Sequence, residues 1–446
     1  MCQVVDEKKP SPLRRFFNSN FKWIVTICVE ICWLIWAFRD PDAHFGRFVE
    51  KTPYIGYYYH MSITMVFGSL VAGATSEGGG AVAFPVMTLA LGVPPRLARD
   101  FSLGIQSFGM TAASVIIFFL GVPLDYEALI WCSVGGTIGL LVGLVGVAPF
   151  LLPSYTKLMF VSLWLSFSVA LFRLNVRKER KVYNSSKESD EFIIEYKRHM
   201  KKTVDVPTGD NADVCLSSIE LDNRKVMRAK RKRIASLVAI GVIGGICSSI
   251  AGSGLDMASF SLLTLYYRVS EKVATPTSVV LMATNAFVGM LCRLIPIGGA
   301  YDPGEAETLW KFLSVCIPVV VVGAPVGAHI PTILSRHQIS YLLYFLSTLQ
   351  FISAYIIIQP WSEPAPHGVG LLVSSAVTLI AGTLFFIKAA NFGELRDADI
   401  ITKEADELSD EESISNTPDE ESIPKTPEDE SIENNLEATV SVPVEN

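Results

Sequence analysis

Charged residues are scarce in this chain, and their scarcity excludes an ordinary soluble globular protein. Of its 446 residues, 18% are charged and 50% are hydrophobic, whereas soluble domains carry about 25% charged residues. Several uncharged runs approach or exceed the roughly 20 residues that a helix needs to span a bilayer. We therefore expect an all-α fold, a polytopic membrane helix bundle.

The chain also lacks the motifs of metal centres, disulfide frameworks and hydrolases. Its eight cysteines include no CxxC pair and lie mostly in apolar runs, so we interpret them as small apolar side chains. No HExxH, GxSxG or close aspartate pair is present, which disfavours an intramembrane enzyme. We predict no catalytic residues, no metal and no cofactor.

The net charge of −7 combines two regions of opposite sign. From Asn391 onward the chain holds 18 acidic and 3 basic residues, whereas the rest is basic. The basic residues gather at 8–22 and 224–233, beside apolar runs, and the positive-inside rule places both groups in the cytosol. Because they flank membrane helices, we expect membrane lipid rather than nucleic acid as their surroundings.

Two glycine-rich breaks interrupt otherwise apolar runs. The first, at 73–85, reads GATSEGGGAVAFP, and the second, at 247–254, reads CSSIAGSG. Glycine weakens a helix, and backbone groups freed in hydrocarbon have no water to bond. Such breaks must line a cavity or be buried in protein. Paired breaks in the two halves of a chain indicate a transport site.

Crossing parity predicts how each break is arranged. An even number of crossings must separate the two basic groups if both face the cytosol. Four intact helices are expected between them, so the broken segment must return to its own side as a hairpin of two half-helices. The two halves are then inverted repeats, each with a glycine-broken hairpin. The intact helices are expected at 23–38, 98–121, 128–152, 155–173, 273–294, 309–334, 339–358 and 369–390.

The predicted organisation has five parts. A cleaved signal peptide is an alternative for the first apolar run. The tail contains a nine-residue repeat, DEESISNTP followed by DEESIPKTP, which a kinase or regulatory protein could recognise. The parts are a cytosolic N-terminus with an extra membrane helix and outer loop (1–59), the first membrane repeat (60–173), a cytosolic connector (174–233), the second membrane repeat (234–390) and a disordered, acidic cytosolic tail (391–446).

The two halves agree in sequence as well as in pattern. Gly78-Gly79-Gly80 aligns with Gly252-Ser253-Gly254, and the segment 98–102 aligns with 274–278. This doubled order of glycine turn, short apolar helix and polar helix start resembles the TauE/SafE sulfite exporter family over about residues 60–390. The resemblance implies a membrane transporter of sulfite, thiosulfate or organosulfur anions.

The paired breaks predict an oxyanion site. Half-helices that start at glycine turns direct backbone N–H groups and the positive end of the helix dipole toward a ligand. Nearby hydroxyl and amide groups are expected to donate to its oxygens, although such groups in membrane helices often bond their own backbone. The predicted substrate-binding residues are Ser76, Gly78, Gly79, Gly80, Ser102, Gly252, Ser253, Gly254, Thr277, Ser278 and Asn285.

Two carboxyl groups lie within the breaks, where an ionisable residue is a functional hypothesis by default. Glu77 is the proton-coupling candidate, since it would bind a proton together with the anion because two negative charges repel each other. It could instead cap the adjoining half-helix or pair with Arg99. Asp256 is interpreted as a cap of the half-helix after Gly254, and Arg99 and Asp100 as helix-end charges at the membrane interface.

These features together predict a secondary transporter that moves a small oxyanion by alternating access, with proton coupling as an option. The alternative is a membrane-anchored receptor or scaffold that acts through its connector and acidic tail. The glycine breaks disfavour this alternative, because an anchor needs no helix interruption inside the bilayer. The substrate, the direction of transport and the organelle are left open by the sequence.

Overall fold

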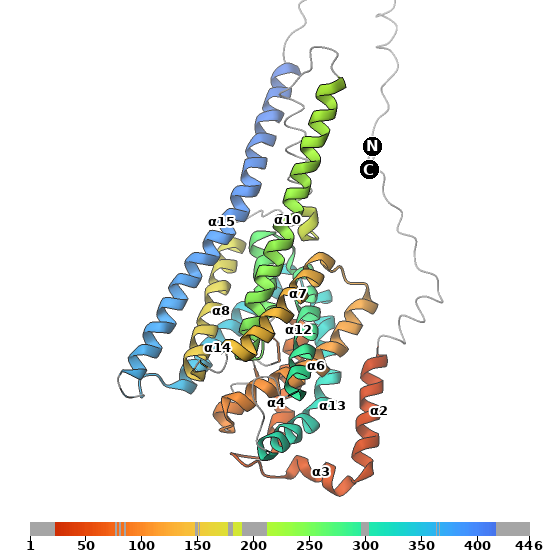
Figure 1. Cartoon of the computed structure of the whole chain (residues 1–446), viewed down its shortest axis with the longest axis vertical. Coiled ribbons are helices and arrows are strands. Elements are labelled where there is room, and N and C mark those ends of the chain that lie inside the picture. The colour runs from red at the N-terminus through yellow and green to blue at the C-terminus, as the bar shows by residue number, and fades with distance from the viewer. Residues whose placement is uncertain are drawn as a thin grey trace, which may run out of the picture. The chain divides into compact units, whose positions relative to one another are not determined.

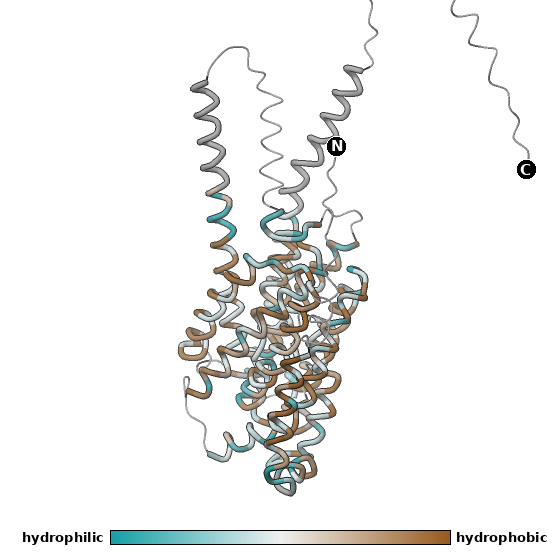
Figure 2. The backbone as a smooth tube through the Cα atoms, turned by 90° about the vertical axis from the view of Figure 1, so that its right-hand side faces the viewer, coloured by the Kyte–Doolittle hydropathy of each residue, from teal (hydrophilic) through white to brown (hydrophobic). Residues whose placement is uncertain are grey.

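The computed structural model describes residues 23–75, 78–79, 82–83, 86–147, 150, 152–176, 182–189, 212–295, 303–362, 364 and 366–415. Helices make up the regular structure of these residues, together with two isolated bridges (Figure 1). Eight of the described helices are long and apolar enough to cross a membrane. Figure 2 shows that hydrophobic residues run along the helices and hydrophilic residues gather near their ends. The all-helical, multi-span prediction is confirmed.

The described helices follow one another with short links. Their bounds are α2 (Ile24–Arg39), α3 (Pro41–Val49), α4 (Tyr58–Ala74), η1 (Val86–Ala90), α6 (Pro95–Leu120), α7 (Tyr126–Val142), η2 (Gly143–Val147), α8 (Pro153–Val176), α10 (Ala212–Ala251), α11 (Leu255–Ser261), η4 (Leu262–Tyr266), α12 (Glu271–Leu294), α13 (Pro303–Ile333), α14 (Arg336–Ile358) and α15 (His367–Ser415). The segments labelled η are single π-helical stretches of five residues.

Local sequence signals explain several helix ends. Helix α6 begins with a proline at its first position and ends at Gly121, whose φ of 66° is left-handed, as glycine readily allows. The Asp125 side chain accepts a bond from Ala128 N and caps α7. Ser335 and Gln338 form a capping box at the start of α14.

The described structure has three helical stretches that the sequence analysis did not expect. Helix α3 forms in the predicted outer loop, α10 begins within the connector, and α15 continues to Ser415, into the predicted disordered tail. The extensions of α10 and α15 are rich in Ala, Glu, Leu, Lys and Arg, which are strong helix formers. The N-terminal basic residues, most of the connector and the tail repeats beyond Ser415 lie outside the described residues.

Chain contacts divide the protein into a main unit, residues 1–397, and a second unit, residues 398–446. Of the second unit, the structure describes the end of α15. Within the main unit, the principal pairs are α6 with α12, α8 with α14, α4 with α13 and α7 with α10 (Figure 1). Buried apolar clusters fill the space around the α4, α6 and α13 pairings and around α8, α11 and α12.

Polar contacts give the direction of two of these pairs. Arg293 near the end of α12 bonds Asp100 near the start of α6, while Thr277 near the start of α12 lies beside Asp125, just after α6. Helices α6 and α12 are therefore antiparallel. Helices α8 and α14 are antiparallel for the same reason, because Ser168 bonds Ser347 and Asn175, farther along α8, bonds the earlier Ser340.

Glycines set the approach of the other two pairs, which run parallel. On α7, Gly139 faces Val242 of α10, and Gly143 lies one turn on, against Ser249. On α13, Gly323 faces Ser69 of α4. A β-carbon at any of these glycines would collide with the opposing helix, so the absent side chain is what allows the two backbones to pack closely.

Replacing Gly139 with alanine should destabilise the protein, because the added carbon would collide with the Val242 carbonyl oxygen. Overpacking of this kind costs about 1–3 kcal/mol. Gly146→Ala is the matched control, since Gly146 follows on the same stretch of chain and has open space around it. Thermal unfolding in detergent should show a lower midpoint for Gly139→Ala only. Equal midpoints would contradict the close α7–α10 approach.

Candidate functional site

The second break folds back on the helix that precedes it. Helix α10 ends at Ala251, and Gly252 follows with a φ of 84°, a left-handed conformation that favours glycine. A β-carbon on Gly244 would lie 2.7 Å from Leu255 Cα, and one on Gly254 would lie 2.6 Å from Cys247 Cβ. Helix α11 therefore lies against the last turns of α10.

The first break is similar in the residues that the structure describes. Helix α4 ends at Ala74, and Gly78 has a φ of 71°. Val82, beyond the turn, lies 3.5 Å from the β-carbon position of Gly68 on α4, so the chain folds back here as well. Three predicted site residues, Ser76, Glu77 and Gly80, lie outside the described residues.

The two breaks come together between α6 and α12. A β-carbon on Gly252 would lie 3.0 Å from both Ser102 Cβ and the Arg99 carbonyl oxygen of α6. One on Gly78 would lie 2.8 Å from Met282 Sδ of α12 and 3.5 Å from Asp256 Oδ2 of the second break. Gly78, Gly79 and Gly252 are all buried. Both breaks thus lie inside the protein, as the sequence requires.

The predicted hydroxyl donors near the breaks bond their own helices. Ser102 donates to Ala98 O at 3.0 Å, and Ser278 donates to Thr275 O at 2.7 Å. Thr277 donates to Val273 O at 2.7 Å and accepts from Asp125 N at 3.1 Å. A hydroxyl has a single proton to donate. In this arrangement these three side chains offer none to a ligand.

The backbone of the second break is also partly satisfied by its own side chains. Gly254 N donates to Asp256 Oδ1 at 2.8 Å, and Leu255 N donates to Ser248 Oγ at 3.0 Å. The interpretation of Asp256 as a cap agrees with the first of these bonds. The expectation that this turn presents all of its N–H groups to a ligand is therefore wrong for Gly254 and Leu255.

Three buried polar side chains near the breaks have atoms without a hydrogen-bond partner in the described structure. They are Gln106 with both amide atoms, Asp256 with Oδ2, and Asn285 with Oδ1. Gln106 Nε2 lies 3.5 Å from the β-carbon position of Gly78, as does Asp256 Oδ2. Unpartnered buried polar groups are costly and need an explanation. Of the predicted site residues, Asn285 and Ser253 are buried here without a protein acceptor for their side chains among the described bonds.

Sequence reasoning missed Gln106, although the chain held a signal for it. Gln106 is an amide within the apolar span 96–120 and follows Ser102 by four residues. Residues four apart share a helix face, so a polar stripe on α6 could have been predicted to face the breaks.

A buried charge cluster adjoins the second break. Asp100 pairs with Arg99 at 2.8 Å and with Arg293 of α12 at 2.8 Å. The Asp100 side chain is 1% exposed, so the interpretation of this residue as an interfacial charge is wrong: its α6 position faces α12. Two guanidinium groups against one carboxylate leave the cluster with a positive charge beside Gly252.

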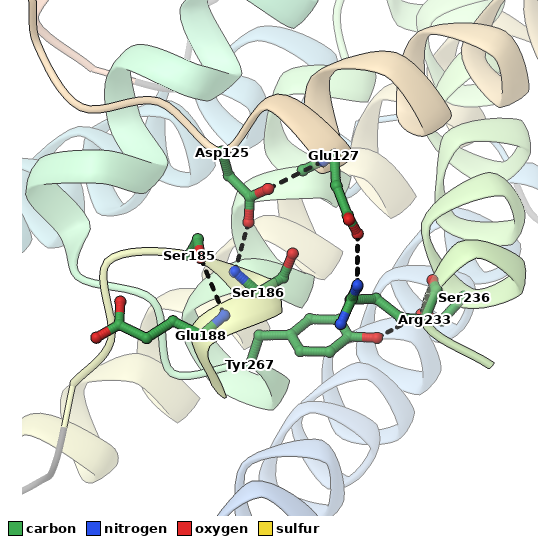
Figure 3. Close-up of polar contacts among 9 residues, drawn as sticks. Asp125, Glu127, Ser185, Ser186, Glu188, Arg233, Ser236 and Tyr267 are labelled. Carbon is green, nitrogen blue, oxygen red and sulfur yellow. Dashed lines mark hydrogen bonds and ion pairs between the residues drawn. The ribbon is translucent and has the colours of Figure 1, made fainter. Parts of the chain in front are cut away.

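A short piece of the connector docks at the other end of α6. Tyr183 pairs with the chain after η4, because its N donates to Arg268 O at 3.0 Å and its O accepts from Ser270 N at 2.9 Å. Ser186 N donates to Asp125 Oδ2 at 2.6 Å. Figure 3 shows these contacts beside two more, Glu127 with Arg233 and Ser236 with Tyr267. The connector segment 182–189 therefore joins the α6–α7 link to the η4–α12 link.

The eight apolar helices and the two buried breaks define an integral, multi-pass membrane protein. The chain belongs to the sulfite exporter TauE/SafE family, a family of membrane transporters, because the model of that family matches residues 61–354. The matched range contains both breaks, and it confirms the resemblance drawn from the doubled motif. Searches among curated proteins and among solved structures found no match to this chain.

Removing the Asp125 carboxylate should release the docked connector segment, because Ser186 N loses its acceptor. A cysteine at Ser186, which is 0% exposed, should react slowly with maleimide in the purified protein. It should react several-fold faster when Asp125→Ala is added. Lys187→Cys is the control, since Lys187 is exposed and should react quickly in both backgrounds. Peptide-resolved mass spectrometry measures both rates; equal rates at Ser186→Cys would contradict the docking role of Asp125.

Proposed function

We propose that this protein is a secondary transporter that moves a small sulfur-containing oxyanion, such as sulfite, thiosulfate or an organosulfonate, by alternating access. One observation carries the proposal. The two glycine breaks are buried and converge on the interior of α6 and α12, where Gly78 of one break approaches Asp256 of the other. Interrupted helices that meet inside a membrane bundle are a recurring form of substrate site in secondary transporters.

Repeated local geometry supports an origin from two repeats. Gly78 and Gly252 both have positive φ angles. Each break is followed by a π-helical stretch that ends with the same bonds, Leu91 N to Val86 O in the first half and Tyr267 N to Leu262 O in the second. Positive φ returns directly afterwards, at Gly92 and at Arg268. The interval in the second and third cases is the same number of residues.

The helix pairing supports the inverted arrangement of these repeats. By order, α6 corresponds to α12 and α8 to α14, and each of these pairs is antiparallel. The remaining pairs are exchanged, since α4 packs on α13 and α7 packs on α10. A two-fold rotation in the membrane plane would produce this pattern. It agrees with the positive-inside expectation that the N-terminus, connector and tail are cytosolic.

Electrostatics favours an anion near the second break. The cluster of Arg99, Asp100 and Arg293 carries a positive charge and lies in a buried region, where charge interactions are stronger than in water. Of the predicted binding residues, Gly78, Gly79, Gly252, Ser253, Gly254 and Asn285 surround this region, to which we add Gln106 as an amide donor. Ser102, Thr277 and Ser278 can contribute only after their hydroxyls rotate away from their present acceptors. Ser76, Glu77 and Gly80 stay predictions.

Two docked segments suit the gates that alternating access needs. Before the first repeat, Ile55 N bonds Leu91 O at 2.9 Å. Before the second repeat, Tyr183 N bonds Arg268 O. Each segment therefore binds the chain that follows a π-helical stretch, at opposite ends of the α6–α12 pair. We propose that these segments detach in alternation, and that a kinase or regulatory protein acts at the acidic tail.

Uptake into proteoliposomes tests the proposal, with a panel of sulfite, thiosulfate, sulfate and small sulfonates. Gly252→Val should abolish saturable uptake, because the added side chain would enter the space between Gly252, Ser102 and Arg99. Gly121→Val is the matched control. Gly121 shares the positive φ but has nothing within 4 Å of its β-carbon position, so this variant keeps the backbone strain without blocking the site.

The two variants separate the transporter from its alternative. Saturable uptake that survives in Gly252→Val would remove the proposed site. No uptake of any member of the panel by the wild-type protein would favour the receptor or scaffold.

A further inference from the structure

Two buried side chains at the meeting point of the breaks carry oxygen atoms that no protein group satisfies. Asp256 is 1% exposed and Gln106 is 2% exposed. Asp256 Oδ2 and both amide atoms of Gln106 have no partner among the described residues. Because Asp256 Oδ2 and Gln106 Nε2 are each 3.5 Å from the β-carbon position of Gly78, one small ligand can reach both side chains.

The chemistry of these atoms suits a cation. A carboxylate oxygen and an amide oxygen are hard acceptors, as small oxygen-seeking cations require. An unpaired carboxylate inside a membrane bundle is costly, and no ion pair to Asp256 occurs in the described part of the chain. The Gln106 amide can rotate, because neither end is held by a bond, so that its oxygen faces the carboxylate.

We propose that Asp256 and Gln106 bind the monovalent cation, a proton or a sodium ion, that crosses the membrane together with the anion. This inference rests on the proposed transport function and names its coupling site. When the cation is a proton, it adds to Asp256 Oδ2 from one side of the membrane and leaves from the same oxygen to the other side. No other bond changes.

Coupling follows from the distance between the two ligands. A bare Asp256 carboxylate beside the break repels an anion, and a bound cation removes that repulsion. Each ligand therefore raises the affinity of the other by the same factor. The loaded site is then closer to neutral, which lowers the cost of moving it between the two access states.

The groups that face Asp256 leave it as the acceptor of the cation. Cys247 of α10 adjoins Gly254. The charged residues on α6 and α12 near the second break, Arg99, Asp100 and Arg293, pair with one another. Glu77 of the first break lies outside the described residues. The position on α12 that corresponds to Gln106 is Met282, so the site is present in one half only and would hold one cation per chain.

A binding test needs no knowledge of the anion. The midpoint of thermal unfolding is measured for purified protein across a range of pH and, separately, across a range of NaCl with choline chloride holding the ionic strength. A ligand that binds the folded state raises this midpoint. We expect the wild-type midpoint to rise with sodium or with acidity. Asp256→Asn should lose that rise, whereas the control Glu127→Gln, which changes a carboxylate paired with Arg233, should keep it.

Transport supplies the second measurement. In proteoliposomes the ratio of sulfite uptake with a pH or sodium gradient to uptake without one should exceed one for the wild type and fall to one for Asp256→Asn. Glu77→Gln should keep the wild-type ratio. A ratio lost in Glu77→Gln and kept in Asp256→Asn would overturn the inference.

Each result decides between the two claims. An Asp256→Asn protein that responds to both cations as the wild type does would refute the cation site while leaving the transporter intact. If Asp256→Asn fails to fold, Gln106→Met decides. A cation response weakened several-fold would support the site, and an unchanged response would refute it. A wild type that binds the cation but moves no anion would instead count against the proposed function.

Discussion

The structure depends on one constraint: a helix interrupted inside hydrocarbon must find partners for its freed backbone groups within the protein. Both breaks meet that constraint by lying between α6 and α12. At the second break the chain supplies its own partners, since Asp256 and Ser248 accept the bonds of Gly254 N and Leu255 N. The packing of the surrounding helices follows from keeping this region closed to lipid.

Close backbone approach is the means by which the bundle encloses the breaks. Glycines on α7 and α13 let those helices contact α10 and α4 without an intervening side chain. The same two helices, α4 and α10, carry the breaks at their ends. Close packing along each helix therefore fixes where its break lies, and a small shift of either pair would move a break relative to α6 and α12.

The sequence predicts the backbone of this protein well and the partners of its side chains poorly. Hydropathy located the eight spans, and glycine content located both breaks, because these are properties of single stretches of chain. The bonds of Ser102, Thr277 and Ser278 depend on which carbonyl is nearest, and the burial of Asp100 depends on the position of Arg293 on a distant helix. Gln106 was missed because its environment is created by α12 and by both breaks. The docking of the connector segment could not be predicted either, since its residues are polar and look like an exposed loop.

The exchanged pairing of α4 with α13 and of α7 with α10 has a consequence for biosynthesis. The first repeat leaves the ribosome with α4 and α7 lacking their final neighbours, because both neighbours belong to the second repeat. Half of the protein thus waits in the membrane in an incomplete state until translation of the other half ends. Assembly is therefore a late event, and quality-control factors that survey unpaired membrane helices would encounter this chain as an intermediate each time it is made.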